Sequence, residues 1–348
     1  MTADPASPAQ VADALRAHLA DALASPDLSY AEPPAPITRG WETYIYAFRL
    51  APPSLPDERF AGPLILRIYP GPLERAARVA QAEYQAQAFV RERGFPAPTP
   101  LLLETGGSVF GRPFMVMKRV PGRPMLDVIL ERPTAFLRLA RLLAETQVQL
   151  HRIDPAEVPF RREVPLLDRM LDEFRQAVKQ FGLHGLRPGI EWLEAHRPPD
   201  ERDVRIVHKD FHPVNVMVEH DAVTGVLDWP NVELADRHAD LGFTLFLLET
   251  AVAEPRSLRE RLIVGFGRRL FTRLYLRAYR RHLPVDRGLL RYYRSLLALR
   301  RLGQYGIWRQ VGAEATGSRP DAITRLDDAQ VQTVARYFRR HTGVQVSL

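Results

Sequence analysis

The segment from Val207 to Trp229, VHKDFHPVNVMVEHDAVTGVLDW, holds the polar residues of this chain whose types and spacing could do chemistry. Asp210 follows the apolar run VRIV, Asn215 begins a short apolar stretch, and Asp228 lies near the end of a second one. NVMVE and TGVLDW are typical of two strands joined by the turn HDAV, and a hairpin brings its two ends together. We therefore expect Asn215 and Asp228 to face one cation, with Asp210 on the adjoining loop.

This arrangement suits phosphoryl transfer. Mg²⁺ is usually bound through one or two protein oxygens, with water and phosphate oxygens completing its shell. A nearby carboxylate that does not bind the metal can accept the proton of an attacking hydroxyl. The residues from His208 to Asn215, followed by Asp228, match the catalytic-loop pattern H-R-D-x-x-x-x-N and its later metal-binding Asp. The alternative is purely structural: Asp210 caps a turn and Asp228 ends a strand.

The surrounding sequence predicts the elements that position these residues. Residues 1–35 are interpreted as an N-terminal helix and a Pro-rich linker. Residues 36–117 contain alternating, β-rich runs and one helical run, which predicts a small, mostly antiparallel nucleotide-binding N-lobe. Residues 118–348 are mainly helical and include the hairpin, so they are expected to form a larger C-lobe with the catalytic loop and acceptor site. The predicted fold class is α+β with two lobes.

Composition narrows the class of protein. The chain has 348 residues, of which 46 % are hydrophobic and 26 % charged, as in soluble globular proteins. It contains no cysteine, which excludes a disulfide scaffold, a Cys-ligated zinc site and a Cys nucleophile, and which fits a reducing cytoplasm. We read no secretion signal, and the longest apolar run, LGFTLFLLETAVA, is interrupted by Glu249. A cytoplasmic protein without a membrane span is expected, and its oligomeric state is not predicted.

The motifs HKDFHPVNVMV, GVLDW and ADLG resemble those of the aminoglycoside phosphotransferase family, relatives of choline kinase with a protein-kinase-like fold. The resemblance extends over roughly residues 36–310. It implies that ATP is the phosphoryl donor, that Asp210 is the catalytic base, and that Asn215 and Asp228 bind Mg²⁺. Asp240, in ADLG, resembles the Asp with which the family supports its catalytic loop. A helix N-cap is the alternative, and the two roles are compatible.

The same resemblance implies where the phosphates of ATP bind. Gly40, in TRGWETYIYAF, occupies the place of the phosphate-covering turn, although the pattern G-x-G-x-x-G is absent. Arg67, in LILRIY, stands where the family normally has Lys, and Arg can bind phosphate bidentately. An acid on the following helix is expected to pair with Arg67. Glu83 is the better placed, and Glu74 is the alternative.

The connection between the lobes is expected to bind adenine. MVMKRVPG resembles the hinge of the family, which implies contacts from the carbonyl of Lys118 and the amide of Val120, with Met117 beside the purine. Mg-ATP would then lie between the lobes.

The acceptor is expected to be a small molecule with a hydroxyl group. Residues 251–310 contain 15 arginines against three acids, which argues against a polycationic aminoglycoside and toward a neutral or anionic compound. The alternative is that these arginines form a solvated face. Three acids could still supply a negative acceptor site: Glu233, Asp236 and Glu249.

Three other functions fit the sequence less well. A protein kinase is disfavoured because only 11 residues separate Asp228 from Asp240, too few for a long activation segment. A catalytically silent, nucleotide-binding kinase-like regulator is supported only by Arg67 and the sparse glycine pattern. No nucleic-acid-binding motif accompanies the positive charge. His208 is expected to hold the loop by packing, and His151 to be a helix-end residue.

Overall fold

A computed structural model describes residues 2–37, 43–52, 57–160, 163–199, 203–250, 258–312 and 328–348. The chain divides into two compact units: unit 1 comprises Met1–Val120 with Val311–Arg325, and unit 2 comprises Pro121–Gln310 with Leu326–Leu348. Gly40, the residue expected in the phosphate-covering turn, lies outside the described residues.

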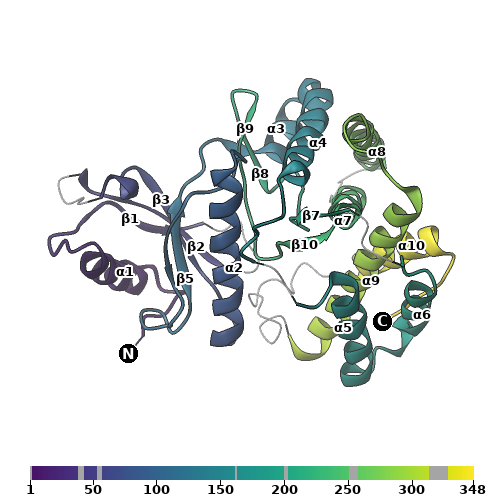
Figure 1. Cartoon of the computed structure of the whole chain (residues 1–348), viewed down its shortest axis with the longest axis horizontal. Coiled ribbons are helices and arrows are strands. Elements are labelled where there is room, and N and C mark those ends of the chain that lie inside the picture. Colours follow the sequence, from purple (N-terminus) through teal and green to yellow (C-terminus); the bar gives the residue numbers. More distant parts are fainter. Residues whose placement is uncertain are drawn as a thin grey trace. The chain divides into compact units, whose positions relative to one another are not determined.

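Unit 1 is built on a five-stranded antiparallel sheet with the order β1-β2-β3-β5-β4 (Figure 1). Its strands are β1 (Tyr30–Pro36), β2 (Tyr44–Leu50), β3 (Pro63–Ile68), β4 (Pro100–Glu104) and β5 (Phe114–Lys118). Its helices are α1 (Pro8–Ala22), the short 3₁₀ helix η2 (Glu58–Phe60) and α2 (Leu73–Glu92). In β2 the buried residues Tyr46, Phe48 and Leu50 alternate with less buried ones, as expected for a strand that buries one face. In β3 the burial does not alternate, because Arg67 is buried as well as Leu66 and Ile68.

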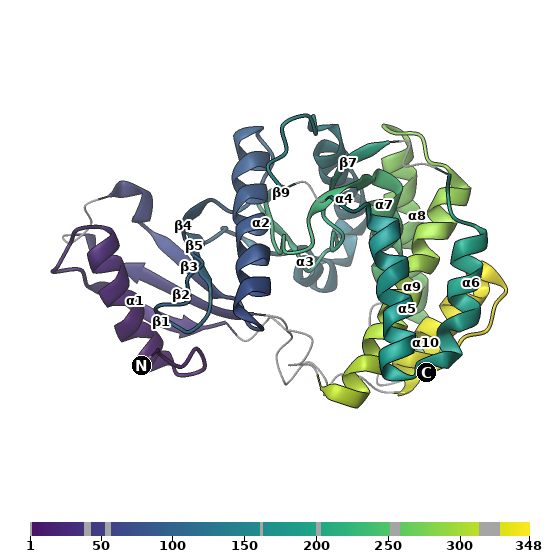
Figure 2. The same cartoon turned by 60° about the horizontal axis from the view of Figure 1, so that its bottom comes forward.

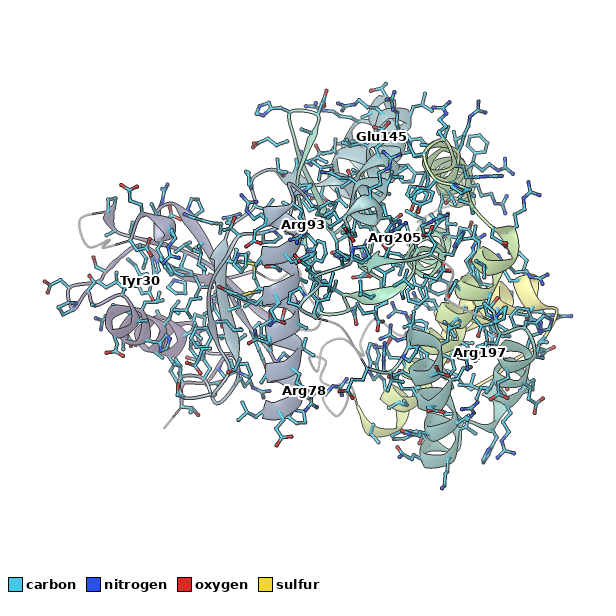
Figure 3. The ribbon with its side chains drawn as sticks, viewed as in Figure 1. Tyr30, Arg78, Arg93, Glu145, Arg197 and Arg205 are labelled. Carbon is cyan, nitrogen blue, oxygen red and sulfur yellow. The ribbon has the colours of Figure 1, made fainter. Side chains whose placement is uncertain are left out.

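The N-terminal helix belongs to this unit. Val11, Leu15 and Leu19 recur on one face of α1 and are fully buried in the apolar core of the sheet. Tyr30, which is labelled in Figure 3, begins β1. Its hydroxyl donates to the carbonyl of Ala12 at 2.9 Å. The prolines of Tyr30–Pro36 favour the predicted linker, but this segment forms β1, an edge strand of the sheet that pairs with β2. Proline is tolerated there because an edge strand leaves one row of amides unpaired.

Unit 2 is mainly helical. Its helices are α3 (Met125–Glu131), α4 (Phe136–Arg152), α5 (Leu166–Phe181), α6 (Arg187–Ala195), α7 (Arg237–Thr250), α8 (Leu258–Arg280), α9 (Arg287–Val311) and α10 (Asp328–Thr342), with 3₁₀ helices η3 (Pro133–Ala135) and η4 (His184–Leu186). Its strands are β6 (Arg123–Pro124), β7 (Val204–Val207), β8 (Val216–Glu219), β9 (Ala222–Val226) and β10 (Glu233–Asp236). They form a β6-β8-β9 sheet and a β10-β7 pair. The structure thus confirms the predicted α+β class, with an antiparallel sheet first and helices after it.

Close helix packing fixes the frame around the segment from Val207 to Trp229. Helices α5, α6, α9 and α10 lie side by side in both views (Figures 1 and 2). Helix α7 approaches α9 so closely at Gly242 that an added Cβ would lie 2.9 Å from the Cβ of Tyr293. A larger residue at 242 would separate the two helices and shift α7, which carries Asp240.

The β8–β9 hairpin brings the two expected metal ligands together. Its two-residue turn, His220–Asp221, has φ values of 43° and 72°, as in a type I′ turn, whose twist matches that of the flanking strands. Val216 pairs with Val226, and the amide of Leu227 donates to the carbonyl of Asn215 at 2.7 Å. Asn215 therefore lies opposite the residue that precedes Asp228.

Within the described ranges, no helix is long and apolar enough to cross a bilayer.

Candidate active site

The loop between β7 and β8 carries Asp210 on a constrained backbone. Lys209, just before it, has φ 64°, and Asp228 has φ 70°. Residues other than glycine rarely adopt this left-handed region, and each such conformation costs about 1–3 kcal/mol, so it persists only where the surroundings hold it in place. Asp240 holds the backbone of Lys209 in this conformation, because the Lys209 amide donates to Oδ1 of the buried Asp240 at 2.5 Å.

Asp210 is oriented and kept ionised by its neighbours. Nδ2 of Asn215 donates to its Oδ2 at 2.8 Å and to its carbonyl at 3.0 Å, and Nε2 of His212 lies 3.3 Å from its Oδ1. Burial acts to raise the pKa of Asp210, but the contact with His212 and the charge of Arg301 outweigh it and hold the pKa well below its usual range. Asp210 is therefore a carboxylate at neutral pH, the form that can accept a proton.

Asn215 and Asp228 fit a hard divalent cation such as Mg²⁺. The hydrogen bonds of the Asn215 side chain use Nδ2, so its Oδ1 is the atom left to face a cation. The β8–β9 hairpin places Asn215 opposite Leu227, the residue just before Asp228. Among the described residues, no three His, Cys, Asp or Glu side chains cluster as a metal site. One amide and one carboxylate suit Mg²⁺, which keeps water and phosphate as its other ligands.

His208 ties the catalytic loop to the segment before Asp228. Its ring is fully buried, Nε2 donates to the carbonyl of Leu227 at 3.0 Å, and Nδ1 accepts from the amide of Asp210 at 3.3 Å. Burial lowers the pKa of His208, which favours the neutral imidazole that can donate at one nitrogen and accept at the other. The ring also packs against Trp229, with the centroids 4.7 Å apart. His208 thus holds the loop, as the sequence predicts.

Asp240 anchors the loop from α7. Its Oδ2 accepts from Nε2 of Gln147 and Nε2 of His151, both at 3.0 Å, while its Oδ1 binds the Lys209 amide. Burial works to raise the pKa of Asp240, but its bonds to His151 and to the Lys209 amide lower it. The N-cap alternative is wrong, because Asp240 is the fourth residue of α7. The cap is Asp236, whose Oδ1 accepts from the His238 amide at 2.8 Å.

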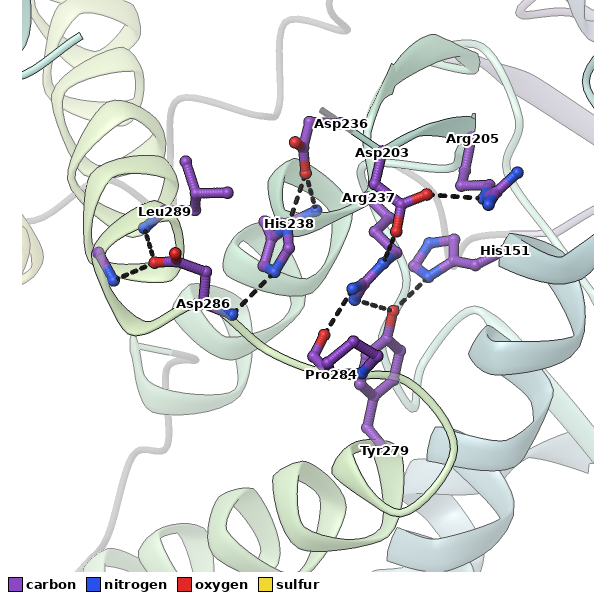
Figure 4. Close-up of polar contacts among 11 residues, drawn as sticks. His151, Asp203, Arg205, Asp236, Arg237, His238, Tyr279, Pro284, Asp286 and Leu289 are labelled. Carbon is purple, nitrogen blue, oxygen red and sulfur yellow. Dashed lines mark hydrogen bonds and ion pairs between the residues drawn. The ribbon is translucent and has the colours of Figure 1, made fainter. Parts of the chain in front are cut away.

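A chain of hydrogen bonds extends from Asp240 into α8, and Figure 4 shows its outer part. A carboxylate only accepts, so Nε2 of His151 donates to Asp240 and Nδ1 accepts from the hydroxyl of Tyr279 at 2.7 Å. Nη1 of Arg237 lies 3.4 Å from that hydroxyl, and the same guanidinium contacts the carboxylate of Asp203 and the carbonyl of Pro284. We call Arg237, Tyr279, His151 and Asp240 the relay.

Sequence reasoning missed most of the relay. His151 does lie in the last turn of α4, as expected of a helix-end residue, but it is also fully buried between Asp240 and Tyr279. Tyr279 lies 128 residues further along the chain, and Gln147 is one more polar residue in an amphipathic helix. The signal that could have found Gln147 and His151 is the placement of polar residues on the apolar face of α4.

In unit 1, Arg67 of β3 and Glu83 of α2 form a buried ion pair. Nη1 of Arg67 lies 3.0 Å from Oε1 of Glu83, and their side chains are 8 % and 0 % exposed. Glu83 also accepts from the hydroxyl of Tyr69 at 2.8 Å and from Nε2 of Gln87 at 3.1 Å. The alternative partner, Glu74, is exposed in the first turn of α2. The predicted pairing with Glu83 is present, and its role toward phosphates stays a prediction.

The residues expected beside adenine lie at the end of β5. Met117 is buried and is the penultimate residue of the strand, and Lys118 ends it with its amide donating to the carbonyl of Thr99 at 2.9 Å. Val120 is the last residue before unit 2 begins. Their contacts with a purine stay a prediction.

The three acids considered for the acceptor site all contact basic side chains. Glu233 is buried, contacts Nζ of Lys209, and lies 2.5 Å from Nη2 of Arg169. Asp236 is buried against Nδ1 of His238 at 2.7 Å, and Glu249 contacts Arg294. The expectation that these acids could make the acceptor site negative is therefore not supported by their surroundings.

Comparison with known proteins places this geometry among phosphotransferases. The model of a family described as the phosphotransferase enzyme family matches residues 35–302. Acyl-CoA dehydrogenase family member 11 of Gallus gallus is 32 % identical over 193 residues, which cover 51 % of this chain and 24 % of that protein. The chain thus spans about a quarter of that relative's length. Streptomycin 3''-kinase of Streptomyces griseus is 29 % identical over 196 residues, covering 51 % of this chain and 68 % of that enzyme.

Solved structures share the fold over most of the chain. An aminoglycoside-3'-phosphotransferase of type VIII superposes with a TM-score of 0.56 at 24 % identity, covering 83 % of this chain and 98 % of that one. A thermostable mutant of another aminoglycoside phosphotransferase, in ternary complex with AMP-PNP and hygromycin B, has a TM-score of 0.59 at 15 % identity, with 92 % and 98 % coverage. At these identities the likeness shows the fold alone, and it confirms the protein-kinase-like fold predicted from the motifs.

Proposed function

The chain belongs to the phosphotransferase enzyme family, and from this premise we propose that it transfers the γ-phosphoryl group of ATP to a hydroxyl of a small molecule. Residues 36–117 would bind the nucleotide, and residues 118–348 would supply the catalytic loop and the acceptor site. A nucleotide analogue bound to a protein of the same fold supports ATP as the donor. Among the described residues, no observation favours a silent nucleotide-binding regulator.

The observation that carries this proposal is the setting of Asp210. Its carboxylate is oriented by Asn215 and lies beside His212, and its lowered pKa keeps it ionised at neutral pH. In the proposed reaction the acceptor oxygen forms a bond to the γ-phosphorus, the bond from that phosphorus to the β–γ bridging oxygen breaks, and ADP leaves. Asp210 accepts the proton that the acceptor hydroxyl loses.

Other residues would bind and orient the nucleotide. Asn215 Oδ1 and Asp228 would hold Mg²⁺, whose charge offsets that of the phosphates when it is bound. Arg67, held by Glu83, would contact the phosphates as the cation of β3. Lys118, Val120 and Met117 would contact adenine. Gly40 would belong to the turn that covers the phosphates.

The acceptor classes to test follow from the similar proteins and from the surroundings of the three candidate acids. The curated relatives are an acyl-CoA dehydrogenase family member and a streptomycin kinase, so hydroxyacyl-CoA thioesters and aminoglycosides are the first two candidates. A polycationic acceptor is less favoured, because Glu233, Asp236 and Glu249 already contact basic side chains. Macrolides, amino alcohols, sugars and nucleosides complete the panel.

The decisive experiment measures ADP release across this panel with Asp210→Asn as the control. We expect Asp210→Asn to bind Mg-ATP as tightly as the wild type and to lose about 10²- to 10⁴-fold in kcat, the usual contribution of general-base catalysis. Asp228→Ala should weaken Mg-dependent ATP binding as well, measured by calorimetry with and without Mg²⁺. Full turnover by Asp210→Asn would exclude this residue as the base.

A further inference from the structure

Two tyrosines of α8 each contact a side chain of α4 that donates to Asp240. Gln147 and His151 lie four residues apart on α4. Tyr275 and Tyr279 have the same spacing on α8, so each pair shares one face of its helix. The hydroxyl of Tyr275 contacts Oε1 of Gln147, and that of Tyr279 lies 2.7 Å from Nδ1 of His151. Two parallel chains of hydrogen bonds therefore run from α8 through α4 to one oxygen, Oδ2 of Asp240.

The carboxylate fixes the direction of both chains. Because a carboxylate only accepts, the atoms that face Oδ2 of Asp240 are N–H donors, namely Nε2 of Gln147 and Nε2 of His151. The opposite atoms of these side chains, Oε1 and Nδ1, are then acceptors, and the hydroxyls that contact them donate. Arg237 supports this direction, because its Nη1 lies 3.4 Å from the hydroxyl oxygen of Tyr279, whose proton is left for His151.

Both hydroxyls remain donors throughout the physiological pH range. Tyr275 and Tyr279 are fully buried, and burial raises the pKa of each phenol above its ordinary value. Within the described part of the chain, the buried polar atoms of both tyrosines and of the two α4 side chains all have hydrogen-bond partners. Removing a hydroxyl from such a network leaves a buried acceptor without its donor, which is unfavourable.

Each hydroxyl opposes a rearrangement that would turn a lone pair toward the carboxylate. Without the hydroxyl of Tyr279, the ring of His151 can take its other tautomer, whose unprotonated Nε2 would face Oδ2 of Asp240. Without the hydroxyl of Tyr275, the amide of Gln147 can rotate and present Oε1 to the same oxygen. In either case Asp240 loses a donor and is held less firmly.

Asp240 connects these chains to the catalytic loop. Its Oδ1 accepts from the amide of Lys209 at 2.5 Å, and Asp210 is the next residue. We propose that Tyr275 and Tyr279 are positioning residues, which orient the donors of Asp240 and thereby hold Asp210 in place. This inference rests on the proposed function, because Asp210 needs a fixed position only if it takes the proton of the acceptor.

The first test is steady-state kinetics of the full-length protein with an acceptor from the panel. Tyr275→Phe and Tyr279→Phe keep the rings and remove only the hydroxyls. Each should lower kcat about tenfold and change the KM for ATP less than about twofold, since one hydrogen bond that orients the loop is lost. In Asp240→Asn, neither substitution should lower kcat further, because its effect passes through that carboxylate. An unchanged kcat in the single variants, or an equal further loss in Asp240→Asn, would overturn the proposal.

The control is Tyr337→Phe on α10. It removes a buried hydroxyl that accepts from Nε of Arg294 at 2.7 Å, so it also costs one hydrogen bond of a buried tyrosine. It should lower the melting temperature about as much as the α8 substitutions and leave kcat unchanged. An equal loss of kcat in Tyr337→Phe would show that stability, rather than the position of the loop, sets the turnover.

A second measurement needs no acceptor. Hydrogen exchange of the Lys209 amide, followed by NMR, reports how firmly Asp240 holds that amide. Exchange should be about tenfold faster in Tyr275→Phe and Tyr279→Phe than in the wild type and in Tyr337→Phe. Unchanged exchange would overturn the proposal. Absence of turnover by the wild type across the panel would instead contradict the proposed function, and the exchange rates alone would then decide whether the two tyrosines hold the loop.

Discussion

Glu83 in unit 1 and Asp240 in unit 2 are both fully buried carboxylates that accept several hydrogen bonds, yet they organise their surroundings differently. Glu83 binds the side chains of Arg67, Tyr69 and Gln87, which all lie within 16 residues of it in sequence. Asp240 binds the backbone amide of Lys209 and two side chains of α4 that lie about 90 residues before it. Glu83 therefore orients one cation, whereas Asp240 fixes the course of the main chain.

This difference has a functional consequence. A side chain that loses its counter-charge can still reach its target in other rotamers, so removing the Glu83 charge should weaken ligand binding without displacing the backbone. A backbone segment held in the left-handed region at Lys209 depends on its anchor, so removing Asp240 should displace Asp210 itself. The roles of the two carboxylates can be distinguished by measuring whether a substitution changes the affinity for the nucleotide or the turnover.

The largest effect is expected for Asp240→Asn. The Lys209 amide loses a charged acceptor, the loop relaxes, and a displacement of about 1 Å at Asp210 lowers kcat by about 100-fold. The loss of a buried, hydrogen-bonded charge should also reduce the free energy of unfolding by about 3 kcal/mol, measured in urea. The KM for ATP should change much less than kcat. A loss of ATP affinity as large as the loss of turnover would break the proposed contrast with Glu83.

A smaller effect of the opposite kind is expected for Glu83→Gln. Glutamine keeps hydrogen bonds to the neighbours but leaves the buried guanidinium of Arg67 without its counter-charge, so we expect the KM for ATP to rise about tenfold and kcat to change less. Glu74→Gln is the matched control on the same helix, since Glu74 is exposed and should behave like the wild type. A fall in kcat with unchanged KM would show that Glu83 acts on the reaction rather than on nucleotide binding.

The smallest expected effect is a pH dependence of stability, which tests whether Asp240 is charged in the folded protein. Its native pKa is lowered, so its ionisation stabilises the fold fully above the ordinary aspartate pKa of about 4, and this contribution is lost as pH falls through the native pKa. The difference in unfolding free energy between wild type and Asp240→Asn, which cannot titrate there, should be constant near neutrality and shrink below about pH 4. Urea unfolding at several pH values measures it. A difference that persists unchanged to pH 2 would mean that the charge of Asp240 contributes nothing.

The parts of the site that the sequence predicts are those whose residues lie near one another along the chain. Asp210, Asn215 and Asp228 lie within one hairpin and its preceding loop, so their spacing alone indicates that they converge. The Arg67–Glu83 pair was also within reach, because the strand and the helix that carry it are consecutive. Local spacing, and the resemblance that it supports, therefore anticipated the geometry of these residues, while their chemical roles stay predictions.

The remaining parts depend on tertiary packing. Nothing in the local sequence of Tyr279 distinguishes it from other amphipathic-helix residues, and Gln147 stands out only as a polar residue on the apolar face of α4. Gln147 contacts Asp240, and Tyr279 contacts it through His151, because α4, α7 and α8 pack together. Glu233 was considered for the acceptor site because it follows the catalytic segment. Its pairing with Lys209 and Arg169 depends on how α5 packs against the loop, which no short motif encodes.

The length of chain that the relay spans bears on the order in which the enzyme matures. During synthesis the catalytic loop emerges from the ribosome well before α8, so when Asp210 first appears, Tyr279 and Pro284 have not yet been added. Asp240 is synthesised before α8, but the imidazole of His151, which contacts Asp240, lacks its partner Tyr279 until α8 has emerged. A nascent chain that ends before α8 would carry every predicted catalytic residue and still lack the scaffold that sets their geometry.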